Sequence, residues 1–238
     1  MIIDLDRLSP RARDAVQRYQ EARQVRRGPL DGVDPRGAAR RVADSMWNPQ
    51  DPRLFQPRAV GLGWDLNLGA VAVRLGLIEP DAEDVPFDAT PDSAFEAAAA
   101  LPIACTAATV AHYAVRGRTL PPRLPAHWSA GGTPDRFVSR RRAGATDIAV
   151  TVASAGLASW AGWGRGSGPE RAGSLAVAAA VGAIGLATTG LRSLPPTRRP
   201  WTGPAMVAGP IAASGAVLLG LARAGRAAEI RRDLQAAR

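Results

Sequence analysis

The sequence predicts an all-α integral membrane protein with about four transmembrane helices and a small, mainly helical cytoplasmic N-terminal region. An α-helix needs about twenty mostly apolar residues to cross a bilayer core at about 1.5 Å per residue. The chain has four stretches of about this length without a charged side chain: 97–115, 148–164, 172–191 and 200–222. The mean hydropathy of -0.07 hides them, because it averages an acid-rich front part with a C-terminal part dominated by Ala, Gly, Val, Leu and Ile.

Composition divides the chain into three regions. An amphipathic helical N-terminal region covers 1–46, a small Trp/Gly-rich domain with an acidic linker covers 47–92, and a transmembrane domain covers 93–238. The last region contains the four expected spans and an ordered loop at 116–144; the spans are placed at 95–115, 146–164, 172–192 and 202–223. A water-soluble Ala-rich bundle is the alternative, but the last two spans lack the polar stripe that a soluble bundle carries on each helix.

The N-terminal region is expected to remain in the cytoplasm, because Met1 to Asp14 carries charges and has no apolar core of the length that a secretory signal needs. Ser9-Pro10 is a typical helix start, and apolar residues then recur at helical spacing as far as Arg27-Gly28. A second start at Asp34-Pro35 leads into a short helix with apolar residues at Ala38, Ala39, Val42 and Met46.

Charge and rare residues exclude several functions. The net charge is +9, and all 30 basic residues are arginines, scattered through the chain without a nucleic-acid motif, so no nucleic-acid partner is expected. The absence of lysine excludes a Walker-type phosphate loop and Schiff-base chemistry. One cysteine, Cys105, and two histidines form neither a disulfide nor a Cys/His zinc cluster. We therefore expect no metal site and no cofactor.

A Trp- and Gly-rich motif opens the second region. Its candidate site residues are Trp47, Asp51, Arg53, Phe55, Gly61, Gly63, Trp64 and Asn67. In this order they resemble a small domain of unknown function, found in actinobacterial membrane proteins, at about 47–69. No chemistry comes with the resemblance. We interpret the aromatic residues as a local core and Asn67 as a tie to the backbone; a ligand site is the alternative.

The segment between the first two spans carries the second motif. Its candidate recognition or structural residues are Pro125, His127, Trp128, Gly131, Pro134, Asp135, Arg136 and Phe137. Together with the preceding span, they make residues 93–165 resemble the membrane domain of unknown function in SdpI-type proteins. The best-known members of that group are immunity proteins that protect a bacterium from its own toxin. The usual Asn after the His-aromatic pair is Ser129 here, so immunity is only a weak implication.

The same segment suggests an ordered loop on the bilayer surface, since prolines stiffen it and Trp128 and Phe137 suit the headgroup region. His127, Ser129 and Asp135 offer a hydrolytic trio on paper, but closeness in sequence says little about triad geometry. We expect no enzyme activity, and we interpret His127 as a hydrogen-bonding anchor. A pH-sensitive or ligand-contacting histidine is the second reading.

Ionisable and small residues complete the prediction for the spans. Glu96, His112 and Asp147 lie near span ends, so snorkelling to the interface is expected. Trp160, Trp163 and Trp201 fit an interfacial aromatic belt. Small surfaces on the later helices favour a compact bundle or homo-oligomer; the glycines that form them are Gly182, Gly185, Gly209 and Gly215.

The resulting prediction is a multi-pass cell-membrane protein of unassigned molecular activity, with the lipid bilayer around it. Its expected role is non-catalytic binding, sensing or an immunity-like function, with an envelope protein or a toxin peptide as the partner. A small-solute transporter or channel subunit is the alternative. Four spans with both ends inside place the arginine-rich loop outside; if 97–115 only dips into the interface, three spans place that loop inside.

Overall fold

The computed structural model describes residues 35–58, 64–80, 87–129 and 131–237. The helix expected between Ser9 and Arg27 lies outside these ranges. The chain forms two compact units, Met1–Pro80 and Asp81–Arg238. The boundary at Pro80 falls within the acidic linker predicted between the small domain and the transmembrane region.

The first unit contains a helix, a two-stranded sheet and a short second helix. Helix α2 spans Pro35–Met46, where the sequence predicted it, strand β1 (Phe55–Pro57) pairs antiparallel with β2 (Trp64–Leu66), and α3 spans Leu68–Arg74. Helix α3 approaches the preceding loop closely, because a Cβ on Gly69 would lie 2.7 Å from the Pro49 backbone nitrogen. The interior is small and contains buried polar side chains such as Ser45 and Asn67 beside Trp47.

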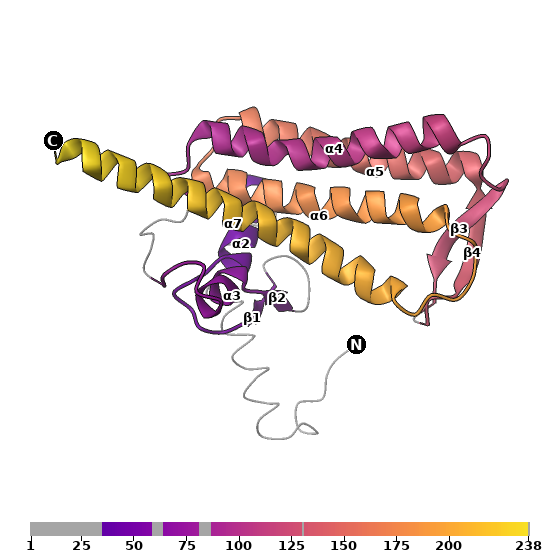
Figure 1. Cartoon of the computed structure of the whole chain (residues 1–238), viewed down its shortest axis with the longest axis horizontal. Helices are drawn as coiled ribbons and strands as arrows, with labels where there is room; N and C mark the ends of the chain where they lie inside the picture. The colour runs from indigo at the N-terminus through magenta and orange to yellow at the C-terminus, as the bar shows by residue number, and fades with distance from the viewer. Residues whose placement is uncertain (1–34, 59–63, 81–86, 130, 238) are drawn as a thin grey trace, which may run out of the picture. The chain divides into compact units, whose positions relative to one another are not determined.

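The second unit is a bundle of four long helices (Figure 1). They are α4 (Asp92–Arg116), α5 (Arg140–Trp163), α6 (Gly168–Arg192) and α7 (Thr202–Ala236). Each packs against the next, and α4 also packs against α6. A β-hairpin joins α4 to α5 and lies at the end of the bundle where α6 ends and α7 begins (Figure 1).

Three of the four helices, α4, α6 and α7, are long and apolar enough to cross a membrane. This fits a membrane protein. The predicted second span, 146–164, lies within α5 almost to its end, but α5 is not among these three helices. Helix α7 is 35 residues long and continues beyond the predicted end of its span at 223.

Small residues bring the helix backbones together. A Cβ on Gly185 would lie 2.5 Å from Thr151 Cγ2, and one on Gly182 would lie 3.0 Å from Ser154 Oγ. This agrees with the predicted role of these two glycines in close packing. Gly209 has open space around it, so packing against a second copy stays a prediction.

Hydroxyl groups join neighbouring helices through backbone carbonyls. Ser154 Oγ donates to Ala178 O at 2.7 Å, and Ser214 Oγ donates to Ala176 O at 2.8 Å. Thr106 Oγ1 donates to Thr151 O at 2.6 Å. Because these hydroxyls are used between helices, they strengthen the bundle.

Arg171 closes the end of the bundle away from the hairpin. Its Nε and Nη2 donate to the carbonyls of Ala161 and Gly162 at 2.9 and 2.7 Å, which satisfies two free carbonyls in the last turn of α5. Its guanidinium also pairs with Asp92 and lies 4.0 Å from the centre of the Phe95 ring. One side chain therefore holds the start of α4, the end of α5 and the start of α6.

Candidate recognition site on the β-hairpin

The segment predicted as an ordered loop is a β-hairpin, so the all-α prediction is incomplete. Strand β3 (Arg123–Trp128) pairs antiparallel with β4 (Pro134–Ser139). The turn between them is closed by the Ser129 backbone N–H, which donates to Thr133 O at 2.9 Å. Gly132 in this turn has a φ of 75°, a conformation that glycine adopts without strain.

The base of the hairpin is fixed to the bundle by apolar packing and one arginine. Leu124 is fully buried in a cluster with Leu120 and Ala143, against which Tyr113 and Val138 pack. Arg140 Nη1 donates to the carbonyls of Arg118 and Leu120 at 3.0 and 2.7 Å. These contacts give the hairpin a fixed direction relative to α4 and α5.

The tip of the hairpin contacts the connection between α6 and α7. Arg199 N donates to Gly132 O at 2.9 Å, and Arg198 Nε donates to Gly131 O at 3.3 Å. A Cβ on Gly132 would lie 1.9 Å from Arg199 O, so only glycine fits here. The predicted site residue Gly131 thus supplies a carbonyl that anchors the tip.

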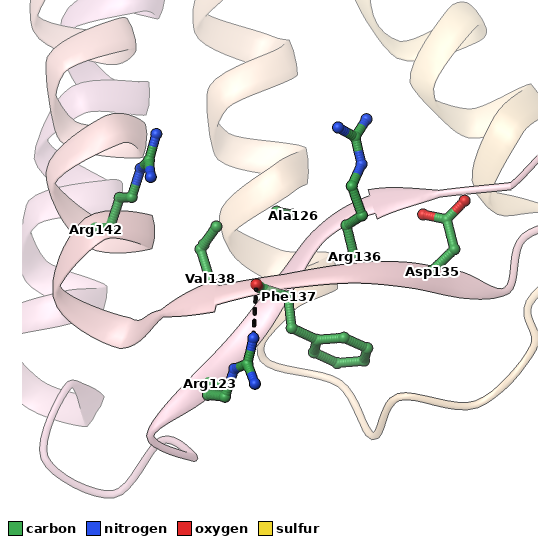
Figure 2. Close-up of a pocket in the computed structure, with 7 residues that line it drawn as sticks. All are labelled: Arg123, Ala126, Asp135, Arg136, Phe137, Val138 and Arg142. Carbon is green, nitrogen blue, oxygen red and sulfur yellow. Dashed lines mark hydrogen bonds between the residues drawn. The ribbon is translucent and has the colours of Figure 1, made fainter.

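The strand pairing is irregular next to His127. Pro125 pairs with Phe137, His127 with Arg136, and Trp128 with Pro134, so each strand has one extra residue. Figure 2 shows the consequence in β4, where the consecutive side chains of Asp135 and Arg136 lie on the same side of the strand. Such bulges redirect side chains, and they occur often near functional sites.

The bulge brings His127 and Asp135 together. The His127 Nδ1 atom lies 2.6 Å from Asp135 Oδ1, and both side chains are about half exposed. The predicted role of His127 as a hydrogen-bonding anchor agrees with this contact. Ser129 Oγ, the third member of the trio, accepts a hydrogen bond from Thr133 N within the turn.

An open depression of about 830 Å³ lies along the hairpin. Its lining residues are Arg123, Ala126, Asp135, Arg136, Phe137, Val138 and Arg142 (Figure 2). Arg136 points to the side from which the helices rise, and Arg142 extends from the first turn of α5 on that side (Figure 2). Phe137 points to the other side (Figure 2). The surface combines three cations with one carboxylate and one exposed aromatic ring, which suits binding of an anionic group.

The remaining predicted residues of this motif have structural positions. Pro125 is buried, and Trp128 and Pro134 are partly buried at the ends of the paired strands. The motif therefore divides into residues that shape the hairpin and residues that present chemistry. His127, Asp135, Arg136 and Phe137 belong to the second group. Arg123 and Arg142, which also line the depression, were not among the predicted site residues, although both lie in the arginine-rich segment between the spans.

The N-terminal motif is organised around the side chain of Asn67, which is fully buried. Its Oδ1 accepts from the backbone N–H groups of Asn48 and Ala70 at 2.9 and 3.2 Å. Its Nδ2 donates to three carbonyls, of Asn48, Asp51 and Arg53, at 2.7, 3.0 and 3.2 Å. The interpretation of Asn67 as a backbone tie agrees with this geometry, and the same side chain caps α3.

The predicted aromatic core of this motif is wrong for two of its three members. Trp47 is buried, but Phe55 is 60% and Trp64 52% exposed. Because side chains alternate along a strand, the pairing of β1 with β2 puts both rings on its outer face, while Gln56 between them is buried. Gly61 and Gly63 lie outside the described residues.

Asp51 and Arg53 form an ion pair within the same motif. The hydrogen bond and the charge of the Asp51 carboxylate raise the pKa of Arg53. The arginine is largely exposed, so the pair contributes little to stability. Its geometry orders the turn, since Asp51 Oδ1 also accepts from the Arg53 backbone N–H at 3.0 Å.

Sequence reasoning missed a buried polar network between α4, α5 and α6. Asp147 was expected to reach the interface, but its side chain is 4% exposed and lies 3.0 Å from Arg192 Nη1. Tyr113 OH and Thr189 Oγ1 donate to Asp147 Oδ2 at 2.7 and 3.2 Å. Nearby, His112 Nε2 lies 2.7 Å from Ser193 Oγ. The only sequence signal was one acid in the second apolar segment and one arginine at the end of the third.

Part of the chain matches a known protein family. Residues 49–74 match a family of unknown function, DUF5808. This supports the expected unknown-function domain at about 47–69, and the structure places β1, β2 and α3 within the matched range. No characterised protein and no solved structure matches this chain. The resemblance of residues 93–165 to SdpI-type domains stays a prediction.

Proposed function

We propose that this chain is a non-catalytic envelope protein with four membrane spans, in which the β3–β4 hairpin recognises a partner at the membrane surface. The observation that carries the proposal is the hairpin itself. It is fixed at its base and at its tip, and it still exposes His127, Asp135, Arg136 and Phe137. A rigid element with exposed charged and aromatic residues is typical of a recognition surface.

The contact between the hairpin and the α6–α7 connection supports four spans. The chain leaves the hairpin through α5 and returns to it through α6 (Figure 1). If α6 crosses the bilayer, α5 must cross it too, because otherwise Gly132 and Arg199 would lie on opposite sides. Both ends of the bundle's chain then lie on the side opposite the hairpin. A cytoplasmic N-terminal region places the hairpin outside.

The proposed partner is an envelope protein or a toxin peptide, as the SdpI-type resemblance implies for an immunity-like role. The exposed surface supports such a partner, since Phe137 supplies an apolar anchor and Arg123 on the same side of the hairpin favours an acidic ligand. Sensing without immunity uses the same surface. Both roles are forms of binding without a chemical step.

Solute transport is the second candidate, and the Asp147–Arg192 pair favours it. Buried ionisable residues in membrane bundles often mark a solute or proton route. The carboxylate is already engaged by Arg192, Tyr113 and Thr189, which fits a lock between helices better than an open route. The serines further along the bundle are also used for packing.

Cysteine accessibility in intact cells tests the topology. Single cysteines at Ser9, Ser129, Ser167 and Thr197, in a Cys105→Ala background, are treated with a membrane-impermeant maleimide. We expect labelling only at Ser129 and Thr197. Labelling at Ser129 without Thr197 would contradict four spans, and recovery of the protein in the soluble fraction would overturn the membrane placement.

Photo-crosslinking tests recognition. A benzophenone amino acid at Phe137 should give a discrete adduct in cells that contain the partner, whereas the same group at Val115, an exposed residue of α4, should not. Arg123→Ala should reduce the Phe137 adduct, because Arg123 lies on the same side of the hairpin as Phe137 and donates to its carbonyl (Figure 2). Equal adducts at both positions would contradict a specific recognition surface.

A further inference from the structure

The depression has two arginines that nothing else in the described structure uses. Within the described ranges, neither the Arg136 nor the Arg142 guanidinium makes a hydrogen bond or an ion pair. Three other arginines at this end of the bundle are engaged: Arg140 with two carbonyls, Arg198 with Gly131 O, and Arg192 with Asp147. Two unpaired guanidinium groups beside one depression attract an anion.

The single carboxylate of the depression does not neutralise them. Asp135 is in contact with His127 Nδ1 at 2.6 Å. Arg123, the third arginine, donates one hydrogen bond to Phe137 O at 3.3 Å, which leaves other N–H groups of its guanidinium for a ligand (Figure 2). Three arginines against one carboxylate leave a surplus of positive charge.

The direction of the side chains identifies the source of the anion. Arg136 lies on the side of the hairpin from which the helices rise, and Arg142 belongs to the first turn of α5 (Figure 2). A helix of 24 residues is about 36 Å long, and a bilayer hydrocarbon core is about 30 Å thick. In a helix that crosses this core, the first two or three residues lie at the level of the lipid phosphates.

We propose that Arg136 and Arg142 bind the phosphate of an anionic lipid headgroup in the depression along the hairpin. The proposal rests on the four-span placement given above. Guanidinium groups bind phosphate oxygens through paired N–H donors. Val138 lies between the two arginines on the same side of the strand and offers apolar contact to the glycerol and first acyl carbons (Figure 2).

Bound lipid would hold the helix-facing side of the hairpin on the bilayer and leave Phe137, on the other side, for the partner (Figure 2). The lipid site and the recognition surface are thus two sides of one hairpin. An acidic peptide that approaches from outside the membrane would meet Phe137 and Arg123 before it met Arg136 or Arg142.

The test uses the full chain purified in a neutral detergent. Binding of dioctanoyl phosphatidylglycerol, dioctanoyl phosphatidylcholine and inorganic phosphate is measured by native mass spectrometry and by the shift in melting temperature. We expect the anionic lipid to bind more tightly than either of the other two. Arg136→Ala and Arg142→Ala should each weaken it by about five-fold, the factor that one arginine near an anionic lipid surface contributes.

Arg141→Ala is the matched control, because it removes the same charge from the same helical turn at a residue that does not line the depression. Equal weakening in Arg141→Ala and Arg142→Ala would overturn the site. Binding of inorganic phosphate as tightly as the lipid would also overturn the lipid assignment. Removing an exposed, unpaired arginine should leave the melting temperature without lipid unchanged, so each variant can be checked for folding.

The two proposals fail separately. Loss of the topology pattern in the cysteine experiment would remove the four-span placement. An unchanged lipid affinity in the Arg136→Ala, Arg142→Ala double variant, with that topology intact, would remove only the lipid site.

Discussion

Asn67 shows how much one short side chain contributes to the small N-terminal unit. It satisfies five backbone groups from a fully buried position. Buried backbone groups need a hydrogen-bond partner, and Asn67 supplies one to groups at both ends of the loop at 48–53. The position of Asn67 in the motif is therefore explained by its role in folding of the unit.

Replacing Asn67 by Ala should destabilise the first unit by about 2–4 kcal/mol, because it removes a helix cap and leaves buried carbonyls unsatisfied. Hydrogen–deuterium exchange of residues 47–75 in the full chain measures this as faster exchange. Phe55→Ala, at an exposed position on the neighbouring strand, is the control and should change exchange little. Equal effects of the two substitutions would contradict the role of Asn67.

Gly132 is the second residue whose identity the structure requires. Gly132→Ala combines a positive φ with a contact to Arg199 O, so the turn and the α6–α7 connection must separate. We expect a loss of about 1–3 kcal/mol in unfolding free energy and greater protease sensitivity at 193–201. Gly156→Ala, which has open space around it, should be nearly neutral; a similar loss there would show that helix insertion, not the turn, is affected.

The three helices α4, α5 and α6 are joined by the Asp147 network near the hairpin end. An ion pair in a low-dielectric interior gains little net stability over an apolar pair of similar size, but an uncompensated charge there is costly. The main effect of the network is therefore on the specificity of helix packing. It fixes which faces of the three helices meet, because Tyr113, Asp147 and Arg192 come from different elements.

Asp147→Ala should destabilise the bundle by about 3–5 kcal/mol, since it leaves the Arg192 guanidinium buried without its carboxylate. The double variant Asp147→Leu, Arg192→Met should recover most of this loss. Unfolding in detergent, followed by tryptophan fluorescence, of wild type, Asp147→Leu, Arg192→Met and the double variant gives the mutant cycle.

A double variant less stable than Asp147→Ala would contradict this reading of the pair. It would instead favour a role for the charges in a solute route, to be measured as uptake in proteoliposomes. Wild-type uptake that both single variants abolish would support the transport alternative.

At the scale of the whole molecule, one tertiary contact limits whether the number of membrane spans is even or odd. If α6 crosses the bilayer, the contact of Gly132 with Arg199 requires α5 to cross it too, although α5 is not among the three helices apolar enough to span. Tertiary contacts thus supply a constraint that hydropathy leaves open. Asp147 lowers the hydropathy of α5, and its pairing with Arg192 offsets part of the cost of that charge.

Reporter fusions test, independently of cysteine labelling, whether the number of membrane spans is even. A green fluorescent protein fused after residue 238 should fluoresce in a bacterial host, and alkaline phosphatase fused after Thr197 should be active, because the first reporter requires the cytoplasm and the second the exterior. Phosphatase activity after residue 238 would contradict an even number of spans.

Helix positions were largely predictable from the sequence, because length and lack of charge are local properties. The spans predicted at 95–115, 172–192 and 202–223 each lie within one helix, as does most of 146–164. The helix at Pro35–Met46 was predictable for the same reason, because its start and its apolar spacing are local signals. The hairpin was not predicted, because its two strands are short and irregular and depend on Leu124 packing against α4 and α5.

The candidate site was predictable in part. His127, Asp135, Arg136 and Phe137 were chosen from the motif, but Arg142 belongs to the next helix and joins them only through the fold. Phe55 and Trp64 were placed in a core because large aromatic residues are usually buried; the pairing of β1 with β2 decided otherwise.

The sequence by itself determined the apolar helices, the charged front region and the position of the two motifs, because each depends on neighbours along the chain. The tertiary structure alone decided the Asp147–Arg192 pair and the anchoring of Gly132 to Arg199, and it placed Arg136 and Arg142 beside one depression. The first two contacts join residues far apart in sequence. Their energies depend on burial and direction, which arise only when the helices pack.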